Sequence, residues 1–294
     1  MKVIPGPASI ELGEKIAELS GLEKVNVAYK VFPDGENYIR LEGSVQKAHV
    51  AIVQTTSAPQ DTNLMQLAFI AAAAKRNGAR KITAVIPYLA YARQDKIFLQ
   101  GENANIETVA AMLNTAGVDE MITVNVHAEG ALARFSFPAL NLTAIPLLAE
   151  HFVRRGFKGA FALAPDKGAM YIAEQAQQVL GGGAGHLEKQ RDRQTGQTTQ
   201  TGGSLDVKGQ IVIIFDDIIS TGGTVVGAAR ILLEQGATQV FAACVHPLLI
   251  GDAEKRILDA GVKEIVGTDS VPRRASKVSL ASLISNSLRA KQSG

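Results

Sequence analysis

"QIVIIFDDIISTGGTVVGAARILLEQG", residues 210–236, joins three patterns that follow one another without a break. Residues 211–215 are all apolar, which is typical of a strand buried on both faces of a sheet. Small and hydroxyl-bearing residues fill positions 220–224, and apolar residues then recur at helical spacing as far as residue 233. A buried strand that passes through a short loop into a helix is the unit from which parallel sheets are built. The stretch therefore predicts an α/β fold.

An internal repeat places this unit within two similar halves of the chain. Four stretches of the first half match four stretches of the second half, in the same order. The matched pairs are residues 49–63 with 210–224, 78–89 with 236–249, 116–125 with 260–269, and 142–152 with 278–288. We therefore predict two tandem duplicated domains, residues 1–145 and 146–294, each a mostly parallel sheet flanked by helices. The terminal helix is free to pack on the N-terminal domain.

The composition excludes several classes of protein. The chain has 294 residues, of which 46% are apolar, enough for the buried core of a soluble globular protein. Lys and Arg number 30 against 28 Asp and Glu, so no overall field favours nucleic-acid binding. We find no uncharged span of membrane-crossing length and no apolar leader, and we expect neither a membrane segment nor export. The single cysteine, Cys244, cannot form an internal disulfide, which favours a cytoplasmic location.

The first half is longer than the second in two places. The extra residues lie within 90–105, "AYARQDKIFLQGENAN", and 127–139, "HAEGALARFSFPA". Duplicated halves commonly diverge when one of them acquires a role that the other lacks, and loops tolerate such change. Both insertions are therefore candidates for functional segments, and ordinary drift in loop length explains them equally well.

The loop at residues 220–224 predicts a phosphate site. A loop that enters a helix presents backbone N–H groups without intrahelical acceptors, and glycine lets the backbone close around an anion. No Lys follows the glycines, so this is not a Walker A loop, and a monophosphate is favoured over a polyphosphate. The residues expected to contact the phosphate are Ser220, Thr221, Gly222, Gly223 and Thr224.

Two adjacent acids, Asp216 and Asp217, come just before that loop. Carboxylates repel phosphate, but they accept hydrogen bonds from sugar hydroxyls or contact a divalent cation. A phosphate at the loop and a diol at the acids together describe a pentose phosphate. A glycine-rich turn alone is often structural, and it is the combination with the strand and the acids that favours a ligand site.

The stretch "VIIFDDIISTGGT", residues 212–224, resembles the phosphoribosyl-pyrophosphate (PRPP) motif of type I phosphoribosyltransferases and of ribose-phosphate pyrophosphokinases, also called PRPP synthetases. Three further stretches favour the second family. Residues 32–40, "FPDGENYIR", are similar to its adenine-binding segment, residues 87–96, "PYLAYARQDK", to its ATP loop, and residues 164–169, "APDKGA", to its pyrophosphate-proximal loop. The resemblance covers nearly the whole chain and implies two phosphoribosyltransferase-type, Rossmann-like domains.

The resemblance implies transfer of the β,γ-diphosphoryl group of ATP, with Mg²⁺ as cofactor, to the C1 hydroxyl of ribose 5-phosphate, giving PRPP and AMP. It makes Lys189 and Arg191, in the polar stretch 187–202, the cations that stabilise the transition state, with Arg191 also contacting ribose 5-phosphate. We expect this stretch to be a mobile loop that closes over the substrate. Without the resemblance, a solvated surface loop is the simpler interpretation.

The resemblance also implies the contacts of ATP and its metal. His127 and Asp166 are expected to contact magnesium. The residues expected to contact ATP are Phe32, Asp34, Gly35, Glu36, Arg93 and Gln94. From the residues alone, a histidine at a strand end is more simply a structural group, and residues 34–36 are an ordinary turn between two strands. In this family that hairpin reaches the ATP of a neighbouring subunit, which implies a homo-oligomer of two or more chains.

Two alternatives remain. A type I phosphoribosyltransferase would consume PRPP together with a nitrogenous base, but it would leave residues 32–40 and 93–96 without a role. A non-catalytic regulatory subunit would have lost catalytic cations or diol acids, whereas Lys189, Arg191, Asp216 and Asp217 are all present.

Some residues depart from the pattern of many bacterial members. Ser220 and Asn125 both stand where an acid is common, and "KQR" at 189–191 replaces "KRR". Ser220 in particular is more similar to the archaeal branch, so neither phosphate and ADP regulation nor a hexamer is carried over to this chain.

Overall fold

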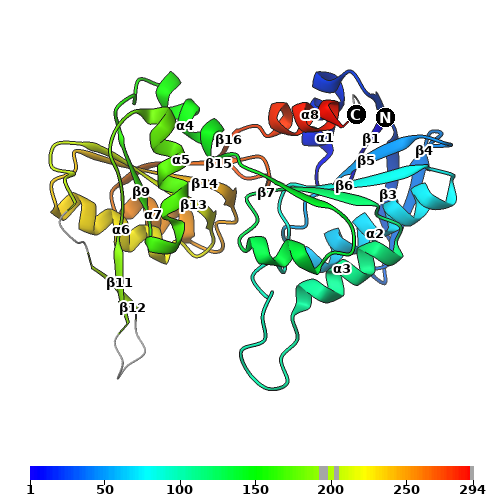
Figure 1. Ribbon diagram of the computed structural model, residues 1–294, viewed down its shortest axis with the longest axis horizontal. Coiled ribbons are helices and arrows are strands. Elements are labelled where there is room, and N and C mark those ends of the chain that lie inside the picture. Colours follow the sequence, from blue (N-terminus) through cyan, green and yellow to red (C-terminus); the bar gives the residue numbers. More distant parts are fainter. Residues whose placement is uncertain (192–197, 202–204, 292–294) are drawn as a thin grey trace. The chain divides into compact units, whose positions relative to one another are not determined.

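The computed structural model describes residues 1–191, 198–201 and 205–291, and for residues 189–191 and 198–201 it describes the backbone alone. The chain divides into two compact units (Figure 1). Unit 1 consists of Met1–Leu142 and Ser279–Gly294, and unit 2 of Thr143–Val278. Each unit is a parallel sheet with helices on its faces, so the predicted α/β class is confirmed.

The sheet of unit 1 has six parallel strands in the order β2-β1-β5-β6-β7-β8. The strands are β1 (Lys2–Pro5), β2 (Glu23–Lys24), β5 (His49–Val53), β6 (Lys81–Ile86), β7 (Glu120–Val124) and β8 (Ala139–Leu142). The central strands are almost wholly buried, which explains why they are apolar without alternation.

Helices cover both faces of this sheet. They are α1 (Ile10–Ser20), α2 (Gln60–Arg76), α3 (Asn105–Thr115) and α8 (Ala281–Ala290), with a 3-10 turn η1 (Glu129–Arg134). From β1 the chain moves to β2 at one side of the sheet, whereas from β5 it moves through β6 and β7 toward the other side. Right-handed crossovers therefore place α1 on one face and α2 and α3 on the other (Figure 1).

Unit 1 also carries an antiparallel hairpin made of β3 (Asn26–Val31) and β4 (Asn37–Glu42). Its two strands pair with each other and with no other described strand. The hairpin is fastened to α2 by the Gln66 amide, which donates to Asn37 Oδ1 at 2.9 Å.

The sheet of unit 2 repeats the same arrangement, with six parallel strands in the order β10-β9-β13-β14-β15-β16. The strands are β9 (Phe161–Ala164), β10 (Ala184–His186), β13 (Ile211–Ile219), β14 (Gln239–Pro247), β15 (Val262–Thr268) and β16 (Ser276–Val278). The helices are α4 (Ile145–Arg154), α5 (Met170–Leu180), α6 (Gly223–Glu234) and α7 (Ala253–Asp259), with a 3-10 turn η2 (Lys167–Ala169). A separate antiparallel ribbon joins β11 (Glu188–Arg191) to β12 (Thr198–Thr201).

The helix after the last strand of each sheet packs in the other unit. Helix α4 follows β8 of unit 1 but packs on α5 in unit 2, and α8 follows β16 of unit 2 but packs on α1 in unit 1. Ile284 and Leu288 of α8 are fully buried, and the Ser285 hydroxyl donates to the carbonyl of Ile16 at 3.3 Å. Unit 1 is therefore built from two separate parts of the chain.

Within the part of the chain that the structure describes, no helix combines the length and apolar character needed to cross a membrane.

Candidate active site

The strand order of unit 2 marks the place where a ligand is expected. From β9 the chain turns through α5 to β10 on one side, whereas from β13 it turns through α6 to β14 on the other side. The loops that follow β9 and β13 therefore diverge from two neighbouring strands. In open parallel sheets, ligands bind at such a point, beyond the carboxyl ends of the strands. Asp166 follows β9 here, and Ser220 begins the loop that follows β13.

Asp216 and Asp217 lie inside β13, before its last two residues. The sequence places them at the end of the apolar run, but the strand continues because Ile218 and Ile219 stay in register with His246 and Pro247 of β14. Asp216 Oδ1 accepts the backbone N–H of Asp217 at 2.9 Å, and Asp217 Oδ1 accepts that of Ile218 at 2.8 Å. Both carboxyl groups are thus oriented by backbone donors at the carboxyl end of the strand.

The surroundings of Asp216 disfavour its ionised form. Burial raises the pKa of Asp216 well above its ordinary value, and the charges of Asp217 and Asp166 add to the effect. The charges of Asp217 and Asp166 therefore make the potential around Asp216 negative, at the point where the loops diverge. Such a site favours hydroxyl donors or a cation over a bare anion.

The loop at 220–224 leads directly into the amino end of α6. Gly222 caps α6 with φ 77°, a left-handed conformation, and a Cβ at this position would lie 2.8 Å from Ile257 Cδ1. Only glycine satisfies both conditions without a shift of the neighbouring side chain. A Cβ at Gly223, where α6 begins, would meet no atom within 4 Å. The space beside Gly223, at the positive dipole end of α6, is therefore open.

A neighbouring loop holds this turn in place. The carbonyl groups of Ile219 and Ser220 accept hydrogen bonds from the backbone N–H groups of Leu249 and Ile250, both at 3.0 Å. The loop after β9 is fixed in a similar way, since Asp166 Oδ1 accepts the N–H of Ala169 at 3.2 Å. The structure thus brings the predicted acids, the predicted phosphate loop and Asp166 to one edge of the unit 2 sheet.

In unit 1 the corresponding place between β1 and β5 is filled by protein. Gln54, directly after β5, is fully buried, and its Oε1 accepts the N–H of Ala8 at 2.9 Å. A Cβ on Gly6 would lie 2.3 Å from that same oxygen, so the glutamine packs tightly against the loop after β1. In the repeat, residues 220–224 pair with residues 59–63, "PQDTN", which contain no glycine, and this absence was the signal in the sequence. The glycine-rich loop predicted to bind phosphate therefore has no counterpart at this point of the unit 1 sheet.

The stretch expected to contact adenine forms the tip of the β3–β4 hairpin. Phe32 N–H donates to the carbonyl of Glu36 at 2.8 Å, and Glu36 N–H donates to Asp34 Oδ1 at 3.1 Å. Gly35 adopts φ 94°, which makes the turn possible. Lys30 Nζ lies 4.3 Å from the centroid of the Phe32 ring, a cation–π contact between the end of β3 and the turn. The predicted residues Phe32, Asp34, Gly35 and Glu36 are therefore neighbours on one exposed tip.

Arg93, Gln94 and His127 lie in two neighbouring loops of unit 1. Arg93 and Gln94 are exposed in the loop after β6, and His127 is exposed after β7, the adjacent strand. The loop of His127 is braced by Asn141, whose Oδ1 accepts the N–H of Val126 at 3.0 Å. The two insertions that carry these residues therefore follow adjacent strands, at the carboxyl edge of the unit 1 sheet.

Lys189 and Arg191 lie on β11, which pairs with β12 in an antiparallel ribbon. The sequence had predicted a loop at these positions. Leu187, directly before β11, is fully buried in the core of unit 2, as is Val207 further along the chain. The side chains of Lys189 and Arg191 and the backbone of residues 192–197 lie outside the described part, so their catalytic role stays a prediction.

His127 belongs to unit 1 and Asp166 to unit 2, so their predicted shared contact with magnesium also stays a prediction. Over residues 1–191, 198–201 and 205–291, no group of three His, Cys, Asp or Glu side chains gathers closely enough to hold a metal. Magnesium, however, usually keeps several waters and is bound through one or two carboxylates plus substrate phosphates. The acids of unit 2 supply oxygen ligands of the type that it prefers.

Comparison with known proteins agrees with this geometry. Residues 1–117 match the family model described as the N-terminal domain of ribose phosphate pyrophosphokinase, and residues 197–288 match the phosphoribosyl synthetase-associated domain. The chain is 39% identical to ribose-phosphate pyrophosphokinase of Methanobrevibacter smithii, over 98% of this chain and 99% of that protein. It is 40% identical to ribose-phosphate pyrophosphokinase 2 of Archaeoglobus fulgidus, over 98% of this chain and 100% of that protein.

A solved structure shows the same fold over the whole chain. Phosphoribosylpyrophosphate synthetase from Mycobacterium smegmatis superposes with a TM-score of 0.88 and 30% identity, covering 100% of this chain and 99% of that one. The resemblance noted in the sequence is thus confirmed, including the similarity to archaeal relatives. The chain belongs to the ribose-phosphate pyrophosphokinase family.

Proposed function

We propose that the chain transfers the β,γ-diphosphoryl group of MgATP to the C1 hydroxyl of ribose 5-phosphate, yielding PRPP and AMP. The observation that carries the proposal is the edge of the unit 2 sheet, where two oriented acids precede a glycine-capped helix start. The names of the archaeal relatives support the same reaction.

These two features contact different parts of ribose 5-phosphate. The phosphate binds to residues 220–224, where the backbone N–H groups at the start of α6 and the hydroxyls of Ser220, Thr221 and Thr224 serve as donors. The carboxylates of Asp216 and Asp217 accept hydrogen bonds from the ribose hydroxyls. Each acid already accepts one backbone N–H, which fixes its orientation before the sugar arrives.

Lys189 and Arg191 act as cations on the transferred group, and Arg191 also contacts ribose 5-phosphate. Phosphoryl transfer requires alignment and charge stabilisation more than a covalent nucleophile. Magnesium, bound with ATP and contacted by His127 and Asp166, would supply further positive charge to the phosphates. Arg93 suits a phosphate because its guanidinium donates in a fixed fork, and Gln94 supports it from the next position.

The hairpin acts on a second copy of the chain, so the active species is a homo-oligomer of two or more subunits. Tyr29, Val31, Phe32 and Tyr38 are all exposed apolar side chains on one two-stranded hairpin. An exposed apolar patch is typical of a contact surface. Phe32, Asp34, Gly35 and Glu36 would then meet the adenine held by the partner.

The reaction is tested by mixing the protein with Mg²⁺, ATP and ribose 5-phosphate. Release of AMP in equal amount to PRPP supports the proposal. Release of ADP would instead identify a sugar kinase, absence of turnover a regulatory subunit, and consumption of PRPP with a nitrogenous base a phosphoribosyltransferase.

The shared site is tested by complementation. The Glu36→Ala variant and the Lys189→Ala variant are each expected to have low activity on their own. In an oligomer that mixes the two, some active sites would combine an unaltered hairpin from one chain with an unaltered Lys189 from the other. Partial recovery of activity on mixing supports a site built from two chains, and no recovery contradicts it.

We also infer a cytoplasmic location. Cys244, the single cysteine, is fully buried in β14 beside the acids, and burial raises the pKa of its thiol. A chain without disulfides fits a reducing compartment. Fractionation of cells followed by immunodetection would test this.

A further inference from the structure

The segment that carries Arg93 and Gln94 is held in place by side chains that lie outside it. It leaves β6 at Ile86 and reaches α3 at Asn105, and its first half turns back over unit 1. Hydrogen bonds fix the segment at three points: at its start, around residues 88–90, at Tyr91 and at Gln94.

The root is fixed by Thr56, which is fully buried after β5. Its hydroxyl donates to the carbonyl of Tyr88 at 2.8 Å and accepts the N–H of Ala90 at 2.8 Å. Its backbone N–H also donates to the carbonyl of Tyr88, at 3.0 Å. One threonine therefore fixes the backbone on both sides of residue 89.

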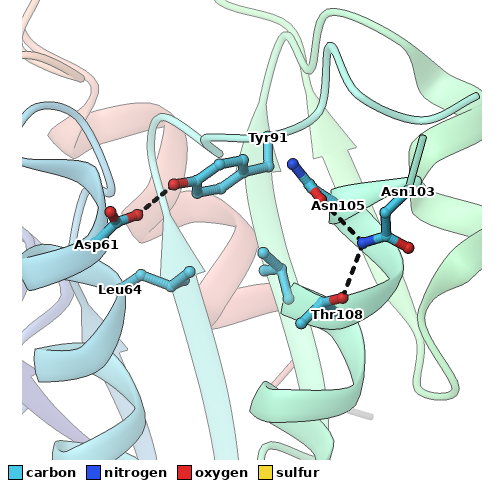
Figure 2. A pocket seen from close by; sticks show the side chains of 7 residues that line it. Asp61, Leu64, Tyr91, Asn103, Asn105 and Thr108 are labelled. Atoms are coloured by element: carbon cyan, nitrogen blue, oxygen red, sulfur yellow. Dashed lines mark hydrogen bonds between the residues drawn. The ribbon is translucent and has the colours of Figure 1, made fainter. Parts of the chain in front are cut away.

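Tyr91 is the second fixed point. It adopts φ 66°, a left-handed conformation that costs free energy for a residue with a Cβ. Its hydroxyl donates a hydrogen bond to Asp61 Oδ1 in the first turn of α2 (Figure 2). The contact with Asp61 fixes the direction in which the following residues leave.

Gln94 is the third fixed point. Its backbone N–H donates to the carbonyl of Tyr91 at 2.9 Å, which closes a turn around Arg93. Asn105 Nδ2, in the first turn of α3, donates to Gln94 Oε1. Asn105 is itself held by Asn103, whose Nδ2 donates to Asn105 Oδ1 at 2.9 Å (Figure 2).

A cavity of about 360 Å³ lies beneath this turn. Its lining includes Leu64 and Val109 together with Asp61, Tyr91 and Asn105 (Figure 2). Ala92 is buried in the core of unit 1 and Tyr91 packs partly against that core, whereas Arg93 and Gln94 are exposed. Core packing therefore anchors the start of the turn, and the polar contacts with Asp61 and Asn105 hold it on the side of the cavity.

We propose that Asp61 and Asn105 are positioning residues, which hold the turn of residues 91–94 so that Arg93 and Gln94 present their side chains to the ATP phosphates. This inference rests on the proposed role of Arg93 and Gln94 in ATP binding. Neither Asp61 nor Asn105 needs to touch the nucleotide for this role.

The test measures kcat and KM for each substrate, with melting temperature, in Asp61→Ala, Asp61→Asn, Asn105→Ala and Arg93→Ala. We expect Asp61→Ala and Asn105→Ala to raise KM for ATP roughly tenfold, as the loss of one orienting hydrogen bond would do, with KM for ribose 5-phosphate unchanged. Asp61→Asn keeps an acceptor for the Tyr91 hydroxyl and is expected to restore most of the loss. A purely structural role would lower the melting temperature without this selective change.

Two controls match the chemistry of the changes. Glu11→Ala removes an acid from the first turn of α1, so it measures the helix-dipole effect that Asp61→Ala also contains. Asn114→Ala removes an exposed asparagine side chain from the other end of α3. Both are expected to leave KM for ATP unchanged. If Asp61→Ala fails to fold, Tyr91→Phe removes the same hydrogen bond from its other end.

The outcomes separate this inference from the one on which it rests. If Arg93→Ala raises KM for ATP but Asp61→Ala, Tyr91→Phe and Asn105→Ala do not, the positioning role is wrong and the ATP loop stands. If Arg93→Ala itself leaves KM for ATP unchanged, the ATP role of the loop is wrong and the inference is overturned with it.

Discussion

Lys291, just after α8, donates a hydrogen bond to Glu120 Oε2 at 3.0 Å, although 171 residues separate the two along the chain. Glu120 begins β7 and is only 5% exposed. Lys81 lies 2.9 Å from the same carboxylate oxygen, and the Thr83 hydroxyl donates to the other at 2.6 Å. The contact fastens the end of α8 to the amino edge of the first sheet, at the opposite edge from the loop that carries Arg93 and Gln94.

The first prediction concerns stability in acid. Burial of Glu120 opposes its ionisation, but the hydrogen bonds from Lys81, Thr83 and Lys291 prevail and lower its pKa to about 2. A carboxyl group whose pKa is lowered on folding stabilises the fold above its unfolded pKa, and that contribution is lost as pH falls toward the folded pKa. We expect Glu120→Gln to cost about 1–2 kcal/mol near neutral pH and progressively less between pH 4.5 and 2.

Urea unfolding at a series of pH values measures this free energy directly. The matched control is Glu23→Gln, which breaks the exposed ion pair with Lys2 and is expected to cost less than about 0.5 kcal/mol. Equal pH slopes for Glu120→Gln and the unaltered chain over this range would show that the network does not lower the pKa of Glu120.

The second prediction separates stability from function at Asp216. Its pKa is raised by burial and by Asp217, so its ionised form destabilises the fold, and this cost appears as pH rises through the folded pKa. Asp216→Asn is therefore expected to raise the melting temperature more at pH 8 than at pH 5, while weakening ribose 5-phosphate binding. Differential scanning calorimetry at both pH values, with KM for the sugar phosphate, provides the measurement. A lower melting temperature at pH 8 would contradict the assignment.

The third prediction contrasts two neighbouring glycines. Gly222→Ala places a Cβ at positive φ and 2.8 Å from Ile257 Cδ1, so we expect a loss of about 1–3 kcal/mol of folding stability. Gly223→Ala adds a Cβ that meets no atom within 4 Å, so the free energy of unfolding is expected to change by less than about 1 kcal/mol. If the phosphate occupies that open space, however, Gly223→Ala should raise KM for ribose 5-phosphate several-fold. An unchanged KM would place the phosphate elsewhere.

The fourth prediction concerns the ribbon of β11 and β12. Lys189→Ala is expected to lower kcat by two or more orders of magnitude with little change in ATP affinity, because a transition-state contact contributes little to ground-state binding. Lys158→Ala, an exposed lysine elsewhere on unit 2, is the control and should leave kcat unchanged. A large loss of ATP affinity at constant kcat would argue for a ground-state role. Steady-state kinetics and equilibrium binding of ATP distinguish the two.

The fold was predictable from the sequence because its strands are buried on both faces. Continuous apolar runs such as 211–215 leave no alternation to suggest a one-sided sheet, and the repeat predicted a second set of strands. The family was predictable because the motifs at 32–40, 87–96 and 212–224 are specific in combination. The end of β13 was predicted less well, since acids usually terminate an apolar run, yet pairing with β14 carries the strand on to Ile219.

The contacts that fix the candidate site were beyond sequence reasoning. Asp61 looks like an ordinary acid in the first turn of a helix, and nothing local links it to Tyr91, 30 residues away. Lys189 and Arg191 lie in a stretch whose polar composition favours a loop, whereas pairing of β11 with β12 makes a ribbon of it. In both cases a contact between distant residues decides the local structure, and propensity does not report such contacts.

The placement of α8 has a consequence for how the chain folds during synthesis. Unit 2 is one continuous stretch, so all of its residues are synthesised before those of α8. Unit 1 begins first but must wait for residues 281–290, and until then the face of α1 that receives Ile284 and Leu288 has no helix on it. The half of the protein that is translated first is thus the half that is finished last.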